Sequence, residues 1–250
     1  MSGHSKWSQI KRQKGVADVR RGQLFSKLSR EITVAARQGS DPEANFRLRL
    51  AVQRARDHNM PLENTERAIK RGTGETGGAA LTEVTLEGYG PNGTAILVEA
   101  MTDNRNRTLQ EVRNAFSRGG GSLGESGCVA WLFDPKGVII IETDDEKAEE
   151  LALEAIDAGS EDVKIGKGYL EIQTELQELE AVRRALEQKS LTLASVELAM
   201  VPKSMVELEE KAALQTLRFL DRLEELDDVQ RVSSNADFSD AVVERYRSQT

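Results

Sequence analysis

Hydrophobic residues in the first third of the chain recur at helical spacing. A first helix is predicted over 17–38, with Gly39 as its C-terminal stop, from the apolar positions Leu24, Phe25, Leu28, Ile32, Ala35 and Ala36. A second helix is predicted over 41–57, because Asp-Pro-Glu at its start supplies an N-cap, a first-turn proline and an acid at the positive end of the helix dipole. A third helix is predicted over 60–72. The first third is therefore expected to be a small helical unit.

The pattern changes after the stretch GTGETGGAA at 72–80, whose composition is typical of a linker. The next block predicts strands at 84–86 and 94–100, a helix at 105–118 and a strand at 128–133, followed by a loop at 134–137. A series in the ferredoxin-like order βαββαβ comes next, over 138–142, 145–157, 163–165, 169–173, 175–188 and 194–201. The chain is predicted to close with a helix at 206–226, a strand at 229–232 and a polar tail.

The order of elements also predicts an insertion. The block over 80–134 lacks one helix and one strand of a comparable sandwich, and the segment after Pro202 offers that pair. The chain is therefore expected to be an α+β multidomain protein with an N-terminal three-helix domain and two α/β sandwich domains. Its predicted divisions are a basic helical domain at 1–76, a middle domain at 80–134 plus 204–238, and an inserted ferredoxin-like domain at 135–203.

Charge is distributed unevenly along the chain. The 250 residues carry 34 basic and 42 acidic side chains, a net charge of −8. Residues 1–75 hold 16 Lys and Arg against 8 Asp and Glu, or +8, so that 76–250 hold 18 against 34, or −16. A basic module on an acidic body is the distribution expected of a protein that contacts a polyanion through one end.

The cations of this module are the first candidate nucleic-acid contacts. On the predicted first helix, the basic side chains fall mostly on a face away from the apolar one. Trp7 fits two roles, since it can stack on a base or sugar or cap the helical core. The candidates are Lys6, Trp7, Lys11, Arg12, Lys14, Arg20, Arg21, Lys27, Arg30 and Arg37.

A second candidate set lies on the helix predicted at 105–118. Arg105 and Arg107 fall in its first turn, where the positive end of the dipole disfavours each cation by about 0.3–1 kcal/mol. Cations placed where the helix dipole disfavours them point to a functional role. Arg118 lies on the same face of this helix as Arg107. An intrahelical pair of Arg107 with Glu111 explains the same residues structurally, and the sequence leaves both readings open.

Motifs of the common enzyme classes are absent from the sequence. It holds no G-x-x-x-x-G-K-[ST], H-E-x-x-H, G-x-S-x-G or C-x-x-C, and its two G-x-G-x-x-G matches, at 72–77 and 119–124, are each predicted to follow a helix and precede a strand. One cysteine and two histidines cannot assemble a Cys/His metal cluster, and no apolar run is long enough to span a bilayer. We therefore expect a cytoplasmic, non-enzymatic protein without metal, cofactor, small-molecule substrate or membrane partner.

Six segments carry a family resemblance: GHSKW at 3–7, LFSKLSREITVAARQG at 24–39, DPEANFRLRLAVQRAR at 41–56, NMPLENTERAIKRGTGE at 59–75, EGYGPNGTAILVEAMTDNRNRT at 87–108 and GGGSLGESGCVAWLF at 119–133. They resemble the YebC family, which includes the mitochondrial translational activator of cytochrome oxidase subunit I. The resemblance implies three domains, and it implies that the basic arm and the first-helix cations face nucleic acid. Members are commonly classed as cytosolic DNA-binding transcriptional regulators, while others look like ribosome-associated translation factors.

Residues and resemblance together predict a non-enzymatic nucleic-acid-binding regulator of gene expression. A DNA-binding transcriptional regulator is the first interpretation, and a ribosome-associated factor bound to ribosomal or transfer RNA is the alternative. No helix-turn-helix with a polar recognition helix is evident, so contacts are expected mainly with phosphates and should depend strongly on salt. An enzyme that uses the 103–107 cluster on a phosphorylated small molecule is the alternative from another class.

Overall fold

The structure is a computed structural model that describes residues 18–77, 80–189 and 191–249. Its N-terminal unit contains the helices α2 (Asp18–Ala35), α3 (Phe46–Asp57) and α4 (Leu62–Gly72), with a 3-10 turn over Ala36–Gln38. Apolar side chains from all three helices, among them Leu28, Ile32, Leu48, Val52 and Ala68, form one buried cluster. The helical spacing in the sequence thus predicted the three helices because their apolar faces meet in a common core.

The start of α3 differs from the prediction. Asp41 accepts a hydrogen bond from the backbone N–H two residues later at 2.9 Å and forms a local turn, while the helix begins only at Phe46. The cap is Asn45, whose Oδ1 accepts from the Leu48 N–H at 3.0 Å and whose Nδ2 donates to the Ala35 carbonyl at 2.8 Å. Asn45 is buried, so it satisfies the start of α3 and ties it to the end of α2 at once.

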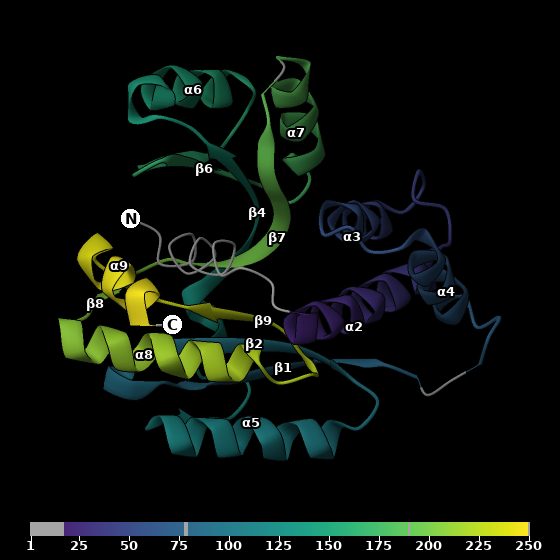
Figure 1. The fold of residues 1–250 in the computed structure, drawn as a ribbon, viewed down its shortest axis with the longest axis horizontal. Helices are drawn as coiled ribbons and strands as arrows, with labels where there is room; N and C mark the ends of the chain where they lie inside the picture. The colour runs from purple at the N-terminus through teal and green to yellow at the C-terminus, as the bar shows by residue number, and fades with distance from the viewer. Residues whose placement is uncertain (1–17, 78–79, 190, 250) are drawn as a thin grey trace.

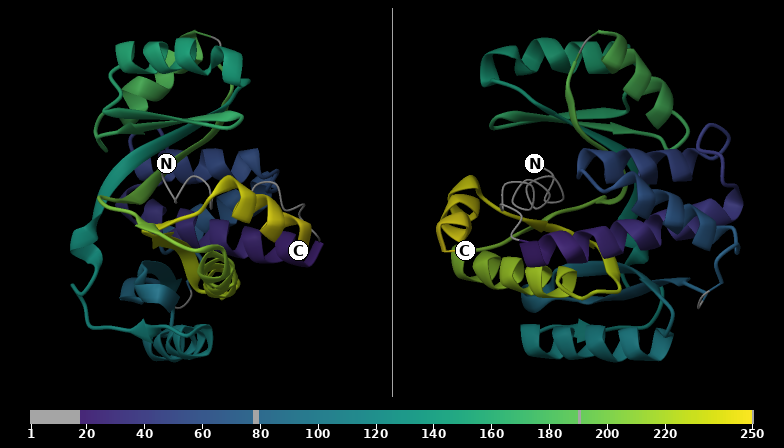
Figure 2. Two further views of the ribbon diagram at one scale, coloured as in Figure 1. Left: turned by 90° about the vertical axis from the view of Figure 1, so that its left-hand side faces the viewer. Right: turned by 45° about the vertical axis from the view of Figure 1, so that its right-hand side comes forward.

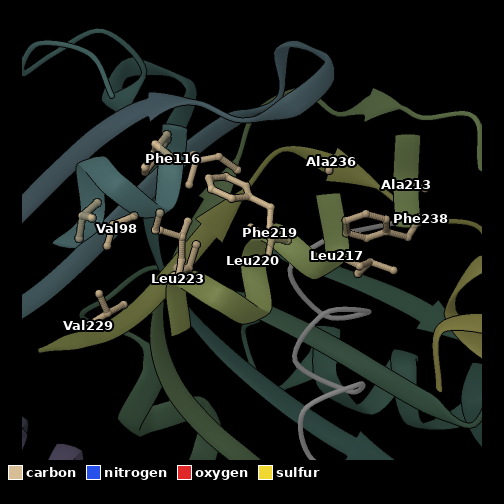
Figure 3. Packing of buried hydrophobic residues seen from close by; sticks show 14 of the residues in the cluster. Val98, Phe116, Ala213, Leu217, Phe219, Leu220, Leu223, Val229, Ala236 and Phe238 are labelled. Carbon is tan, nitrogen blue, oxygen red and sulfur yellow. The ribbon is translucent and has the colours of Figure 1, made fainter. Parts of the chain in front are cut away.

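The middle unit is an antiparallel sheet with helices packed on one face. The strand order is β3-β1-β2-β9, formed by β1 (Thr82–Tyr89), β2 (Ala95–Thr102), β3 (Ser122–Leu123) and β9 (Val229–Ser234), with a 3-10 turn over Pro91–Gly93 between β1 and β2. Residues of α5 (Arg105–Gly119) and α8 (Glu210–Glu224) share one core with the sheet. At its centre the Phe116 and Phe219 rings meet edge to face, with centroids 5.0 Å apart (Figure 3).

The third unit has the ferredoxin-like arrangement. It consists of β4 (Phe133–Glu142), α6 (Asp145–Asp157), β5 (Asp162–Gly166), β6 (Tyr169–Thr174), α7 (Leu179–Gln188) and β7 (Leu193–Pro202). The strands pair in the antiparallel order β5-β6-β4-β7, and residues of α6 and α7 share a core with this sheet (Figure 1).

Strand pairing explains how the third unit is inserted. β2 is hydrogen-bonded to β9, although the whole third unit lies between them in the sequence. Phe133 pairs with Pro202, so the inserted segment leaves the middle unit and returns to it at neighbouring points. Figure 2 shows the third unit stacked on the middle unit with the N-terminal helices beside both. The predicted fold class is confirmed, while the residue boundaries of the domains stay a prediction.

The predicted strand at 128–133 is wrong up to Leu132. Its backbone is engaged by a side chain, because the Glu87 carboxylate accepts from the N–H groups of Gly127, Val129 and Ala130 at 2.7–2.9 Å. Groups committed to a carboxylate cannot join a strand ladder, so the segment forms a turn and a 3-10 helix over Ala130–Leu132. These hydrogen bonds outweigh the opposing effect of burial and lower the pKa of the Glu87 carboxyl.

The predicted loop at 134–137 is also wrong, because β4 runs through it. Pro135 pairs opposite Met200 of β7, but β6 pairs with β4 only from Gly137 onward. Proline has no N–H to donate, and it is tolerated where a strand is paired on one side only, because the other side has no partner strand that needs this donor.

The polar tail contains a further helix, α9 (Asp240–Gln249). Val242, Val243 and Tyr246 are buried in the core of the middle unit. The two-residue strands β8 (Val206–Glu207) and β10 (Ala236–Asp237) pair in parallel, so α8 begins later than predicted. Among the described helices, none combines the length and the apolarity that crossing a bilayer requires.

Candidate nucleic-acid interface

The predicted contacts of the N-terminal unit are only partly described. Lys6, Trp7, Lys11, Arg12 and Lys14 lie outside the described residues, and Arg20 is placed on α2 by its backbone alone. Arg21 is exposed, with its guanidinium 5.5 Å from the centre of the Phe25 ring. Arg37 is exposed in the turn that follows α2.

Lys27 and Arg30 contact the middle unit. Lys27 donates to the Glu224 carbonyl and Arg30 to the Asp227 carbonyl, at the C-terminal end of α8. The Arg30 guanidinium also lies 3.3 Å from the carboxylate of Asp228. Cations are favoured at this end of a helix because the last carbonyls carry its partial negative charge. Two of the predicted phosphate contacts therefore dock α2 onto α8.

Arg107 of α5 contacts the same Asp228 carboxylate as Arg30. Its Nη2 lies 2.7 Å from Asp228 Oδ2 and 2.9 Å from Asp103 Oδ1. The hydroxyls of Thr102 and Thr108 donate to the same Asp228 oxygen at 3.1 and 2.7 Å, and the Asp228 side chain is only 4% exposed. A carboxylate from the far end of the chain thus compensates a cation in the first turn of α5, where the helix dipole disfavours it.

The Asp228 carboxyl is held in its charged form. Burial raises its pKa, but hydrogen bonds from Arg107, Thr108 and Thr102 and the charge of Arg30 outweigh burial, so that the pKa lies below its ordinary value. Hydrogen bonds to Asp228 and to Asp103 raise the pKa of the Arg107 guanidinium. We call these side chains the Asp228 cluster: Arg30, Thr102, Asp103, Arg107, Thr108 and Asp228.

Other ion pairs join the units around two clefts. A cleft of about 340 Å³ between the three units is lined by charges of both signs, with Arg47 paired to Glu83 and Arg231 3.6 Å from Glu197. A second cleft of about 440 Å³ separates α3 from α7 and β7, and Arg49 there lies 3.8 Å from Glu180. Cations of α3 are therefore also paired with acids of the larger body.

Arg118 lies in a third depression, between the C-terminal end of α5 and α8. This groove has a volume of about 380 Å³, and its charged lining consists of Arg118, Lys211, Arg218 and Arg222. The three α8 cations were missed in the sequence, although their spacing was visible. On a helical wheel they fall within about 40° of one another.

No group of three or more His, Cys, Asp and Glu side chains that could hold a metal ion occurs in the described ranges.

Family models cover nearly the whole chain. The model of the TACO1/YebC N-terminal domain matches residues 5–75, and that of the TACO1/YebC second and third domain matches 81–236. The chain belongs to the TACO1/YebC family. The family resemblance in the sequence is therefore confirmed over both the helical unit and the two sheet units.

Relatives of this TACO1/YebC chain match it over nearly its full length. A probable transcriptional regulatory protein of Dehalococcoides mccartyi strain CBDB1 is 58% identical over 250 residues, with 100% of both chains covered. One from Herpetosiphon aurantiacus is 51% identical, again with 100% of both chains covered. The crystal structure of a conserved hypothetical protein from Aquifex aeolicus is 46% identical and aligns with a TM-score of 0.82 over 89% of this chain and 93% of that chain.

The TACO1/YebC fold brings some predicted contacts together and separates others. Arg30 and Arg107 meet at Asp228, with Lys27 at the adjoining end of α8. Arg105 is exposed at the start of α5, and Arg118 lies at its other end. Their roles toward nucleic acid stay predictions.

Proposed function

We propose that this TACO1/YebC chain is a non-enzymatic regulator of gene expression that binds nucleic acid through its N-terminal unit, with DNA as the target. The charge distribution carries the proposal, because +8 on residues 1–75 attracts a polyanion that −16 on 76–250 repels. The relatives are named probable transcriptional regulatory proteins, which supports transcription as the process regulated. The proposal includes a cytoplasmic location and no cofactor, small-molecule substrate or membrane partner.

Binding through phosphates fits the described helices better than reading of base edges. Lys27 and Arg30 of α2 are engaged with α8, and Phe46 and Leu50 of α3 pack against the core of the third unit. A recognition helix has to enter the major groove with one long face free, which is at odds with these contacts. Exposed cations such as Arg21 can reach phosphates without such a face.

Titration of the full chain with duplex DNA and with purified ribosomes, each at about 50 and about 200 mM salt, tests the proposal. The expected result is DNA binding that weakens steeply between the two salt concentrations, as phosphate contacts require, and that stays tighter than ribosome binding at both. Ribosome binding that survives while DNA binding collapses would instead assign the chain to translation on ribosomal or transfer RNA. Binding to neither would refute the argument from the basic unit.

A matched pair of variants assigns the binding to the N-terminal unit. Arg21→Gln with Arg37→Gln removes two exposed cations of that unit, and Lys147→Gln with Lys189→Gln removes two exposed cations of the third unit. Only the first pair should weaken binding and lower the dependence of affinity on salt. An equal effect of both pairs would refute the assignment to one end of the chain.

A further inference from the structure

The middle unit holds a concentrated positive surface within an acidic part of the chain. The α5–α8 groove is lined by Arg118, Lys211, Arg218 and Arg222, and the remaining lining side chains, such as Leu214 and Gln215, carry no charge. We propose that this groove binds the phosphodiester backbone of the nucleic acid as a second contact, an inference that rests on the proposed function.

The sign of the charge selects the ligand. Residues 76–250 carry −16 overall, so four cations with no carboxylate among the described lining residues form a local field opposite to that of their surroundings. Side chains at Arg118, Lys211 and Arg222 are exposed and can reach a ligand lying in the groove. Arginine in particular matches phosphate oxygens with two donors in one plane.

The length of the cationic row fits a strand of nucleic acid. Lys211 and Arg222 are eleven positions apart on one helix, which at 1.5 Å per residue places them about 16 Å apart along its axis. Phosphates of one strand of duplex DNA advance by about 3.4 Å along the duplex axis, so the row extends over roughly five of them. A small phosphorylated metabolite would use only part of such a row.

The walls of the groove are fixed by close packing. A Cβ on Gly119 would lie 2.2 Å from Cδ2 of Phe219, so only glycine lets the end of α5 approach α8 this closely. The helix then ends with Gly120 in the left-handed conformation, at φ 83°. Beneath the crossing, Phe219 packs against Phe116 (Figure 3). Cations on rigid helices lose less freedom on binding than cations on a mobile loop.

The cationic row of the groove ends close to the N-terminal unit. Lys27 of α2 donates to the Glu224 carbonyl, two positions beyond Arg222, so that α2 meets α8 at the end of the cationic row (Figure 1). A strand held along α8 is thereby directed toward α2, where Arg21 is exposed. The two positive surfaces can therefore act on one ligand.

The test compares two double variants of the full chain that remove equal charge. Lys211→Gln with Arg222→Gln neutralises the groove, and Lys147→Gln with Lys189→Gln neutralises exposed cations of the third unit. Glutamine is a good helix former, so both proteins should keep the wild-type circular dichroism spectrum. Fluorescence anisotropy measures binding to a labelled 30-base-pair DNA duplex and to an RNA hairpin of equal length, between 50 and 200 mM salt.

The groove variant should bind at least about tenfold more weakly at 50 mM salt. The negative slope of log affinity against log salt on the duplex should become shallower by about 1.8, since each of the two lost phosphate contacts removes about 0.9 from its magnitude. The third-unit variant should keep the wild-type slope. A loss confined to one probe supports the groove and identifies DNA or RNA as its ligand. Wild-type binding with equal slopes in both variants would overturn the groove and leave the proposed function standing, whereas no wild-type binding to either probe would overturn both.

Discussion

Replacing Asp228 with asparagine should cost about 2 kcal/mol of unfolding free energy. The Asp228 carboxylate accepts from Arg107 at 2.7 Å and faces Arg30 at 3.3 Å, and hydrogen bonds to charged groups contribute about 1.5–3 kcal/mol each. Asparagine keeps an acceptor for the two threonine hydroxyls but loses the charge. Arg107 is 44% exposed, so water rehydrates it, and the loss stays below the 3–5 kcal/mol seen when a fully buried pair is broken.

Asp103→Asn provides the matched control. It removes the same charge from the same guanidinium, because Asp103 Oδ1 lies 2.9 Å from Nη2 of Arg107. The Asp103 side chain is 44% exposed, and exposed pairs contribute about 0.2–1 kcal/mol. Both variants therefore remove a charge from Arg107, but only Asp228→Asn removes a buried carboxylate that also pairs with Arg30.

Urea unfolding followed by circular dichroism measures both free energies, and amide hydrogen exchange reports on α2 separately. Asp228→Asn should also speed exchange in α2, since Arg30 docks that helix on the cluster. Equal destabilisation by the two variants, or a loss below about 0.5 kcal/mol for Asp228→Asn, would refute the claim that the buried carboxylate holds the units together.

Three further predictions concern stability. The advantage of wild type over Asp228→Asn should be complete above about pH 5 and should shrink in urea titrations as the pH falls further, because the folded pKa of Asp228 lies below its unfolded value near 3.9. Glu87→Gln should lower the urea midpoint by an amount equivalent to about 2 kcal/mol, because an amide NH₂ would face a backbone N–H donor; an unchanged midpoint would contradict this. Gly119→Ala should lower the thermal midpoint through collision with Phe219, whereas Gly22→Ala on α2, with nothing within 4 Å, should raise it; a rise in both would show that the crossing is not tight.

The fold was largely predictable from the sequence because most elements bury one periodic face. α2 and α4, the ferredoxin-like series and the pairing of the first sheet with a late strand all followed from spacing and element order. The errors arose where a distant side chain engages the backbone. Glu87 takes the N–H groups of 127–130, and no local pattern marks these as unavailable to a strand.

The candidate site was less predictable, because a cation on a helix does not reveal its partner. Lys27 and Arg30 lie on the predicted polar face of α2, but their partners are carbonyls and a carboxylate nearly 200 positions later. The stripe of Lys211 and Arg222 was visible as spacing alone. It was missed because the net charge of its surroundings is negative.

Pairing within the chain changes how the charge of the N-terminal unit should be counted. In the Asp228 cluster two guanidiniums face two carboxylates. Because Asp228 is buried, a phosphate that replaced its carboxylate beside Arg30 and Arg107 would itself lose its hydration. Attraction for a polyanion must then come from exposed cations, such as Arg21 on α2 and Arg222 on α8. Because the Asp228 cluster fixes α2 against α8, its contribution to binding is the spacing between these two positive surfaces and not a phosphate contact of its own.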